Sequence, residues 1–179
     1  MKNWHIALVA AAAGTAALIG TAQAITDTAF TYSTAKTGFY TIGPRDMNPV
    51  LSSTGYSVDN GGVHVTTAGF TCFVAGVHLP NGAKIGQVGV WYRSAGGGQG
   101  LQFHLQRTQL SIAFPQIIVS RNVVDVSTDS KLVTATPTDA TRTTVSNGSF
   151  VYDFQFCANA NDVAFQFARF TYTYTSAGD

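Results

Sequence analysis

Glutamate is absent from this chain of 179 residues, so all nine acidic side chains are aspartates. Glutamate is a good helix former, whereas the abundant Thr, Val, Phe and Tyr favour pleated strands. Charged residues make up only 11% of the chain, and its formal net charge is +1. The composition therefore predicts an all-β protein and gives no electrostatic reason to expect binding to nucleic acid or to anionic lipid.

Familiar catalytic and phosphate-binding motifs are also missing. The sequence contains no Gly-x-Ser-x-Gly elbow, no His-Glu-x-x-His pair, no P-loop and no dinucleotide fingerprint. The Gly-rich run 96–100 leads into a strand pattern instead of a helix, which favours a hairpin connection over a phosphate cradle. The sequence alone assigns no activity.

Metal-binding patterns are equally sparse. His64, His78 and His104 lie on separate predicted strands or at a strand end, and no His-x-His pair puts two ligands on one face. We therefore expect no metal centre and no cofactor. Calcium is an open alternative, because residues 59–62 and 159–162 offer oxygen ligands, although neither run has the spacing of a calcium-binding loop.

The N-terminus has the order of features found in a secretory signal peptide. Lys2 precedes an apolar run over residues 6–20, and Ala22-Gln23-Ala24 supplies a small-residue cleavage site. A membrane anchor is the competing interpretation, but the run is shorter than the ~20 residues a spanning helix needs. We expect residues 1–24 to be removed and residues 25–179 to form one extracellular domain that does not contact the membrane.

Cys72 and Cys157 are the two cysteines of the chain. Outside the cytosol such a pair is usually oxidised, and each lies in an apolar, strand-like run, so we predict a disulfide between them. Two buried thiols are the alternative. A structural zinc site is not expected, because two cysteines supply only half of the four ligands it needs.

Alternating residues mark the clearest strands. Leu101–Gln106 places its apolar and polar residues on opposite faces, and 150–156 puts four aromatics on one face. Residues 164–175 change phase, which predicts a bulge near Ala168. About eight to ten such runs separated by turns predict two packed antiparallel sheets.

The turn signals suggest how some strands connect. Asn81-Gly82 tolerates the positive φ of tight hairpins, so we expect residues 74–79 and 84–92 to pair. The run from Gly76 to Ala83, Gly-Val-His-Leu-Pro-Asn-Gly-Ala, resembles a motif of uncharacterised secreted bacterial proteins, notably of actinomycetes. In those proteins a His-Leu-Pro-Asp/Asn-Gly-Ala turn joins two sandwich strands.

This resemblance extends over most of the mature chain. The opening run 29–32 and the closing strand 165–174 are similar too. The resemblance implies a jelly-roll-like sandwich and brings no activity or site residue with it.

Aromatic residues are the remaining functional lead. Trp91 and Tyr92 have opposite parity on one strand, so one of them should face outward. Tyr172 and Tyr174 alternate with threonines and form the most surface-like stripe. Exposed aromatic stripes mark ligand sites or subunit contacts.

Three functions follow from these observations. The first is a non-catalytic secreted structural or interaction protein, able to form a homo-oligomer through its aromatic strand. The second is an extracellular carbohydrate-binding module. The third, a small hydrolase, would have to use Asp pairs for glycoside hydrolysis, with Asp125, Asp129 and Asp153 as the available carboxylates.

Overall fold

The computed structural model describes residues 30–59, 61–66, 69–94, 100–124, 129–159 and 163–177. The predicted signal peptide and most of the Gly-rich run therefore lie outside the described residues. Within these ranges the chain forms strands and two short 3-10 helices, and contains no α-helix. None of the described segments is a helix that could cross a bilayer.

The strands vary from two to fifteen residues in length. In chain order they are β1 (Phe30–Ile42), β2 (Asn48–Pro49), β3 (Tyr56–Asp59), β4 (Gly62–Val65), β5 (Phe70–Gly76), β6 (Lys84–Ser94), β7 (Gly100–Gln109), β8 (Pro115–Val124), β9 (Ser130–Ala135), β10 (Phe150–Asn159) and β11 (Val163–Ala177). The 3-10 helices are η1 (Pro44–Asp46) and η2 (Ala140–Arg142).

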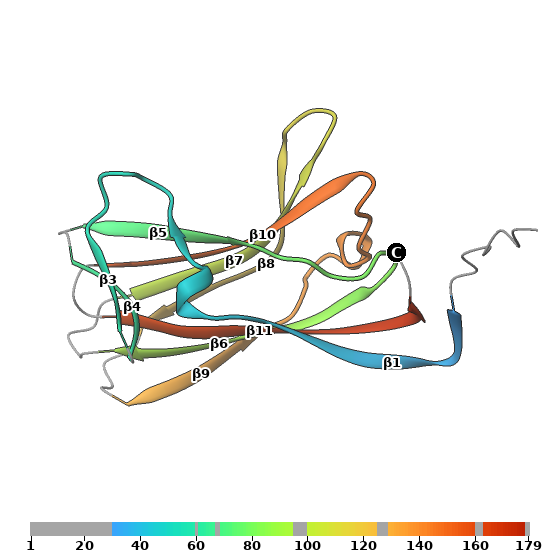
Figure 1. The fold of residues 1–179 in the computed structure, drawn as a ribbon, viewed down its shortest axis with the longest axis horizontal. Helices are drawn as coiled ribbons and strands as arrows, with labels where there is room; N and C mark the ends of the chain where they lie inside the picture. Colours follow the sequence, from blue (N-terminus) through green and yellow to red (C-terminus); the bar gives the residue numbers. More distant parts are fainter. Residues whose placement is uncertain are drawn as a thin grey trace, which may run out of the picture.

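The strands form two antiparallel sheets packed face to face (Figure 1). The six-stranded sheet has the order β3-β4-β11-β6-β9. Its sixth strand, β1, pairs with the same edge of β11 as β4 does, but further along β11. The five-stranded sheet has the order β2-β5-β10-β7-β8. Two antiparallel sheets packed in this way confirm the predicted all-β sandwich fold class.

Between the sheets lies a core rich in phenylalanine. The predicted alternation is confirmed in β7, where Leu101, Phe103 and Leu105 are buried, and in β10, where Tyr152, Phe154 and Phe156 are buried. The largest fully buried aromatic side chains are Phe73, Phe103, Phe154, Phe156, Phe165 and Phe170. Their rings pack mostly at tilted or edge-on angles, as in the 5.5 Å contact of Phe154 with Phe170.

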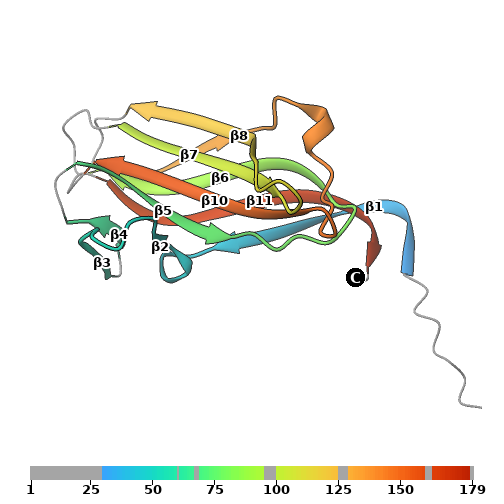
Figure 2. The same cartoon turned by 90° about the horizontal axis from the view of Figure 1, so that it is seen from above.

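The predicted pairing of residues 74–79 with 84–92 is wrong. β5 pairs with β10 and β2 in one sheet, whereas β6 pairs with β11 and β9 in the other. The Asn81-Gly82 pair does form a turn, with Gly82 at φ 75° and the Ala83 N–H donating to the Pro80 carbonyl. This turn carries the chain across from one sheet to the other (Figure 2).

The predicted disulfide between Cys72 and Cys157 is present. The two residues face each other across β5 and β10, with their Cα atoms 4.0 Å apart and their positions separated by 85 in sequence. The bond therefore joins neighbouring strands of one sheet that are distant along the chain.

The bulge predicted for β11 is also present, slightly earlier in the strand. The register against β6 shifts between Phe165 and Phe167, and again between Thr171 and Tyr172. Phe165 consequently points into the core, while Phe167 points to the outer face of the six-stranded sheet.

Candidate functional site

The outer face of the six-stranded sheet carries a row of aromatic side chains. On β6, Val90 and Tyr92 are buried in the core, so Trp91 between them faces outward. Trp91 pairs with Phe167 across β6 and β11, and their rings stack with centroids 4.3 Å apart and planes 17° apart. Stacking of this kind holds both rings at the surface in one arrangement.

A guanidinium extends this row toward β1. The Arg169 guanidinium carbon lies 5.1 Å from the centre of the Trp91 ring and 5.3 Å from the centre of the Phe39 ring. Phe39 is 60% exposed, and a cation between two aromatic rings is held by both of them. On the other side of Trp91, its β9 partner Leu132 is 50% exposed.

The row therefore runs across four strands. From β9 to β1 its members are Leu132, Trp91, Phe167, Arg169 and Phe39. We call these five residues the aromatic row. It is an apolar surface with one positive charge on a sheet whose outer face is otherwise rich in threonine.

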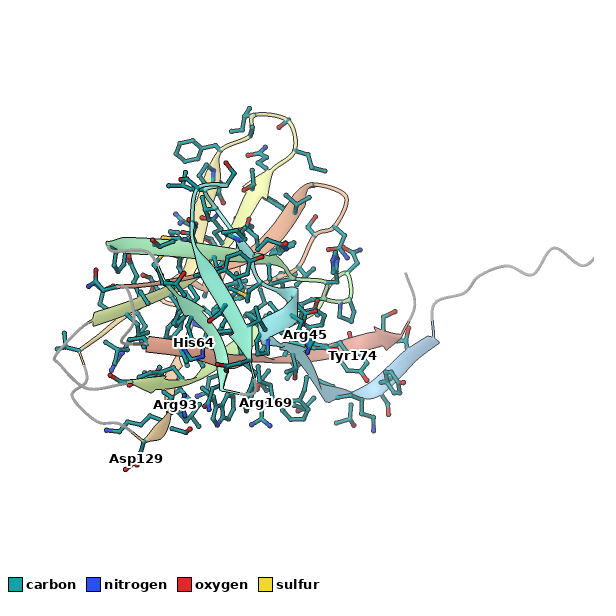
Figure 3. All side chains as sticks on the ribbon, turned by 60° about the vertical axis from the view of Figure 1, so that its left-hand side comes forward. Arg45, His64, Arg93, Asp129, Arg169 and Tyr174 are labelled. Atoms are coloured by element: carbon teal, nitrogen blue, oxygen red, sulfur yellow. A yellow bond between two sulfur atoms is a disulfide. The ribbon has the colours of Figure 1, made fainter. Side chains whose placement is uncertain are left out.

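A polar cluster lies beside the row, where β4 pairs with β11. His64 Nε2 is 3.0 Å from Asp59 Oδ1, and the Gly61 N–H donates to the same oxygen at 2.6 Å. The hydrogen bond to His64 contributes most to holding the pKa of Asp59 below its usual value. The Gly61 hydrogen bond and the nearby Arg93 lower this pKa further. Arg93 is two residues from Trp91 on the same face of β6, and Figure 3 shows it with Arg169 on that side of the sheet.

Of the four aromatic residues predicted from sequence, only Trp91 belongs to this surface. Tyr92 is 2% exposed and packs in the core, so it cannot meet a ligand at the surface. Tyr172 and Tyr174 are half-buried on the inner side of β11, and the threonines between them face outward. The centroids of their two rings are 5.8 Å apart, and the Tyr174 ring packs edge-on against the Tyr32 ring of β1 with centroids 5.7 Å apart.

The tyrosine stripe thus packs against residues of the chain's own β1. A Cβ atom at Gly38 of β1 would lie 2.5 Å from the Tyr172 ring, so the ring rests directly on that glycine. The expectation of an open stripe placed the tyrosines, and not the threonines, on the solvent face of this strand. Here the wet face is the one that carries the threonines.

The outer face of the five-stranded sheet is polar around Asp153 and His104 and has no comparable aromatic row among the described residues. Asp153 accepts a 2.8 Å hydrogen bond from Gln106 on the neighbouring strand. Burial raises the pKa of Asp153 above its usual value, and the Gln106 hydrogen bond opposes this. His104, also half-buried on this face, has its pKa lowered by burial.

No group of three or more metal-ligating side chains occurs among the described residues. Of the two runs considered for calcium, Asn60 and residues 160–162 lie outside the described residues. Asp59 is engaged by His64 and Gly61. Asp125, one of the carboxylates considered for hydrolysis, is likewise outside the described ranges.

Comparison with known proteins gives likeness of fold alone. No protein-family model and no curated protein sequence matches the chain. Similar solved structures include the CBM22-1–GH10 modules of Clostridium thermocellum xylanase Xyn10B with xylohexaose (12% identity, TM-score 0.48, covering 77% of this chain and 27% of that one). Another is the family 11 carbohydrate-binding module of the same organism with a mixed-linked tetrasaccharide (13%, 0.37, 80% and 91%).

A third is CBM28, a module specific for non-crystalline cellulose (10% identity, TM-score 0.41, covering 74% of this chain and 86% of that one). The chain spans about a quarter of the xylanase chain and 37% of a family two carbohydrate esterase from Cellvibrio japonicus. At sequence identities this low, the likeness is one of fold and does not indicate a ligand for this chain.

Proposed function

We propose that this chain is a secreted, extracellular carbohydrate-binding domain that holds a polysaccharide against the aromatic row without acting on it chemically. The observation that supports this most is the fixed, outward-facing Trp91, stacked on Phe167 and flanked by Arg169. Flat aromatic surfaces combine apolar contact area with a low entropic cost of ordering, which suits the apolar faces of sugar rings.

The polar groups beside the row fit the same ligand. Arg169 and Arg93 present guanidinium N–H donors, and Asp59 and His64 lie near Arg93. Sugar hydroxyl groups accept and donate hydrogen bonds, so both kinds of partner are needed. The near-neutral charge of the chain suits an uncharged polymer.

Binding without catalysis is part of the proposal. Four of the five described aspartates have partners that are not carboxylates: Asp46 accepts from the Gly43 N–H, Asp59 bonds His64, Asp139 bonds Thr141 and Arg142, and Asp153 bonds Gln106. Glycoside hydrolysis of the usual kind needs two carboxylates facing one bond. The disulfide suits an extracellular location.

Retention on insoluble polysaccharides tests the proposal. The mature protein, starting at Ile25, should be retained saturably by at least one neutral polysaccharide, with a change in Trp91 fluorescence. Trp91→Ala should weaken retention by about tenfold or more, the value of one large aromatic contact. Leu51→Ala is the control, because Leu51 is 64% exposed but lies in the turn after β2.

The proposal fails if no polysaccharide retains the protein, or if Trp91→Ala and Leu51→Ala have equal effects. Light scattering on the same samples separates this function from self-association. A defined oligomer with no retention would restore the structural interpretation. Mass spectrometry of the secreted protein checks cleavage after Ala24.

A further inference from the structure

The hairpin between β7 and β8 ends in an exposed apolar tip. Its loop, residues 110–114, projects from the sandwich above the five-stranded sheet (Figure 1). Leu110, Ile112 and Phe114 alternate along it and are 58%, 63% and 62% exposed. Residues 109–116 include no charged side chain. Three large apolar groups on a projecting tip need an explanation that core packing does not give.

The tip is held in shape by its own hydrogen bonds. The Ala113 N–H donates to the Gln109 carbonyl at 2.8 Å, and the Gln109 N–H donates to the Phe114 carbonyl at 3.3 Å. The Gln109 side chain also bonds the Ser111 hydroxyl at 3.1 Å. Ala113 adopts a left-handed backbone with φ 51°, which is uncommon for a residue other than glycine. These hydrogen bonds preorganise the loop. They also satisfy backbone N–H and carbonyl groups that would otherwise bond to water.

Apolar surface continues from the tip down the outer face of the five-stranded sheet. Pro115 pairs with Thr108, which in turn pairs with Val151, so these three lie side by side. Val151 and Ile117 are both exposed. The apolar surface is thus convex at its tip and continuous at its base.

The nearest charged groups at the base of the hairpin are mostly basic. Arg107 lies over the Phe150 ring at 4.2 Å, and Arg142 donates to the Ile117 carbonyl at 3.2 Å. Asp139 is paired with Arg142 at 2.8 Å and also feels the charge of Arg107. Two basic groups therefore face one acid here. On the sheet face behind the hairpin, the Asp153 carboxylate is bonded to Gln106.

We propose that this tip inserts into the interfacial layer of a lipid bilayer, with Leu110, Ile112 and Phe114 among the upper acyl chains and the two arginines at the headgroups. A convex tip needs no shaped receptor, and interfacial binding grows with apolar area and attraction to anionic lipid. A stable protein interface needs about 1,000 Å² of complementary surface, which a tip of three side chains does not supply. The sequence predicts no membrane contact, because the tip is neither a spanning segment nor a strongly charged one.

Vesicle co-sedimentation tests the proposal on the full mature protein. Vesicles of phosphatidylcholine with phosphatidylglycerol should bind the protein, and vesicles of phosphatidylcholine alone should bind it less. The variant Ile112→Ser with Phe114→Ser should lose binding by about tenfold or more, because each change removes a large apolar group that would enter the bilayer. Leu51→Ser is the matched control, since Leu51 is equally exposed but lies elsewhere. Thermal unfolding should be unchanged, because all of these side chains face solvent.

Several results would overturn the inference. Absence of sedimentation with both vesicle types would do so, as would equal losses in the tip variant and the Leu51→Ser control. A wild-type dimer that the tip variant abolishes would instead assign the tip to a second copy of the chain. Trp91→Ala should leave vesicle binding intact, so this test is independent of the proposed polysaccharide site.

Discussion

Gly89 lies directly beneath the indole ring of Trp91. A Cβ atom at Gly89 would come within 3.3 Å of Cζ3 of Trp91 and 3.2 Å of Cδ1 of Leu132. Because glycine has no side chain, the indole can lie against the sheet and still stack on Phe167. Gly89 is thus a positioning residue of the aromatic row.

Gly89→Val should therefore tilt the indole away from the sheet. Trp91 is the only tryptophan in residues 25–179, so its fluorescence should report the change directly. If the row binds polysaccharide, retention should fall about five- to tenfold, which corresponds to the loss of one aromatic contact of roughly 1–1.5 kcal/mol. Gly148→Val is the control, because nothing lies within 4 Å of a Cβ there. Unchanged fluorescence in Gly89→Val would show that the indole does not rest on Gly89.

Replacing both cysteines, Cys72→Ala with Cys157→Ala, should lower the free energy of unfolding by at most roughly 4–5 kcal/mol. The bond closes a loop of 85 residues, and the chain-entropy model assigns that value to it. Urea unfolding of the oxidised wild type and of the double variant measures the difference. Equal unfolding midpoints would mean that the bond constrains the unfolded chain very little.

Much of the fold follows from alternation in the sequence. Leu101, Phe103 and Leu105 alternate with polar residues, and burial of one sheet face selects that pattern. The same reasoning located Tyr152, Phe154 and Phe156 in the core. Alternation identifies strands well because it is a local property of six or seven consecutive residues.

Strand partners could not be predicted in the same way. Asn81-Gly82 specifies a turn, but a turn geometry does not determine whether the next strand pairs with the preceding one or crosses to the other sheet. The partner of β5 is β10, which lies some 85 residues away at the disulfide. Such contacts depend on global packing and leave no signal in the turn itself.

The candidate site was predicted only in part. Parity predicted that one of Trp91 and Tyr92 faces outward without deciding which, and Phe167 has the same parity as the buried Phe165, so it is expected in the core. The register shift between these two residues turns Phe167 outward. Phe39 and Arg169 could not be placed beside Trp91 without knowing that β1 and β6 flank β11.

Gly38→Ala should destabilise the protein by about 1–3 kcal/mol, the usual cost of overpacking. The new methyl group would lie 2.5 Å from the ring of Tyr172, which also packs against Tyr174. Thermal unfolding measures the loss. In the Tyr172→Ala background the same substitution should cost much less, because the ring it meets is gone. Additive effects of the two changes would contradict the contact.

Asp153→Asn should stabilise the protein near neutral pH. Burial raises the pKa of Asp153 in the folded state, so ionisation above that pKa costs folding free energy. The asparagine can still accept the hydrogen bond from Gln106. Because Asp153 is only half-buried, the gain should be under about 1 kcal/mol. It should disappear as the pH falls through the raised pKa toward 3.8, where the wild-type carboxyl is protonated. A gain that is constant over this range would exclude titration of Asp153 as its cause.

His104 should give the opposite pH dependence on the same sheet face. Burial lowers its pKa below the usual 6.5, so between the two values the unfolded chain binds the proton more readily than the folded one. Wild-type stability should therefore fall as the pH drops below about 6.5. His104→Gln keeps a polar side chain opposite Gln155 and removes the titrating group. Urea unfolding should measure the difference in free energy of unfolding between the two proteins at pH 8 and at pH 5. We expect this difference to shift in favour of the variant as the pH falls from 8 to 5. If the difference between them is the same at both pH values, packing and not protonation of His104 distinguishes the two proteins.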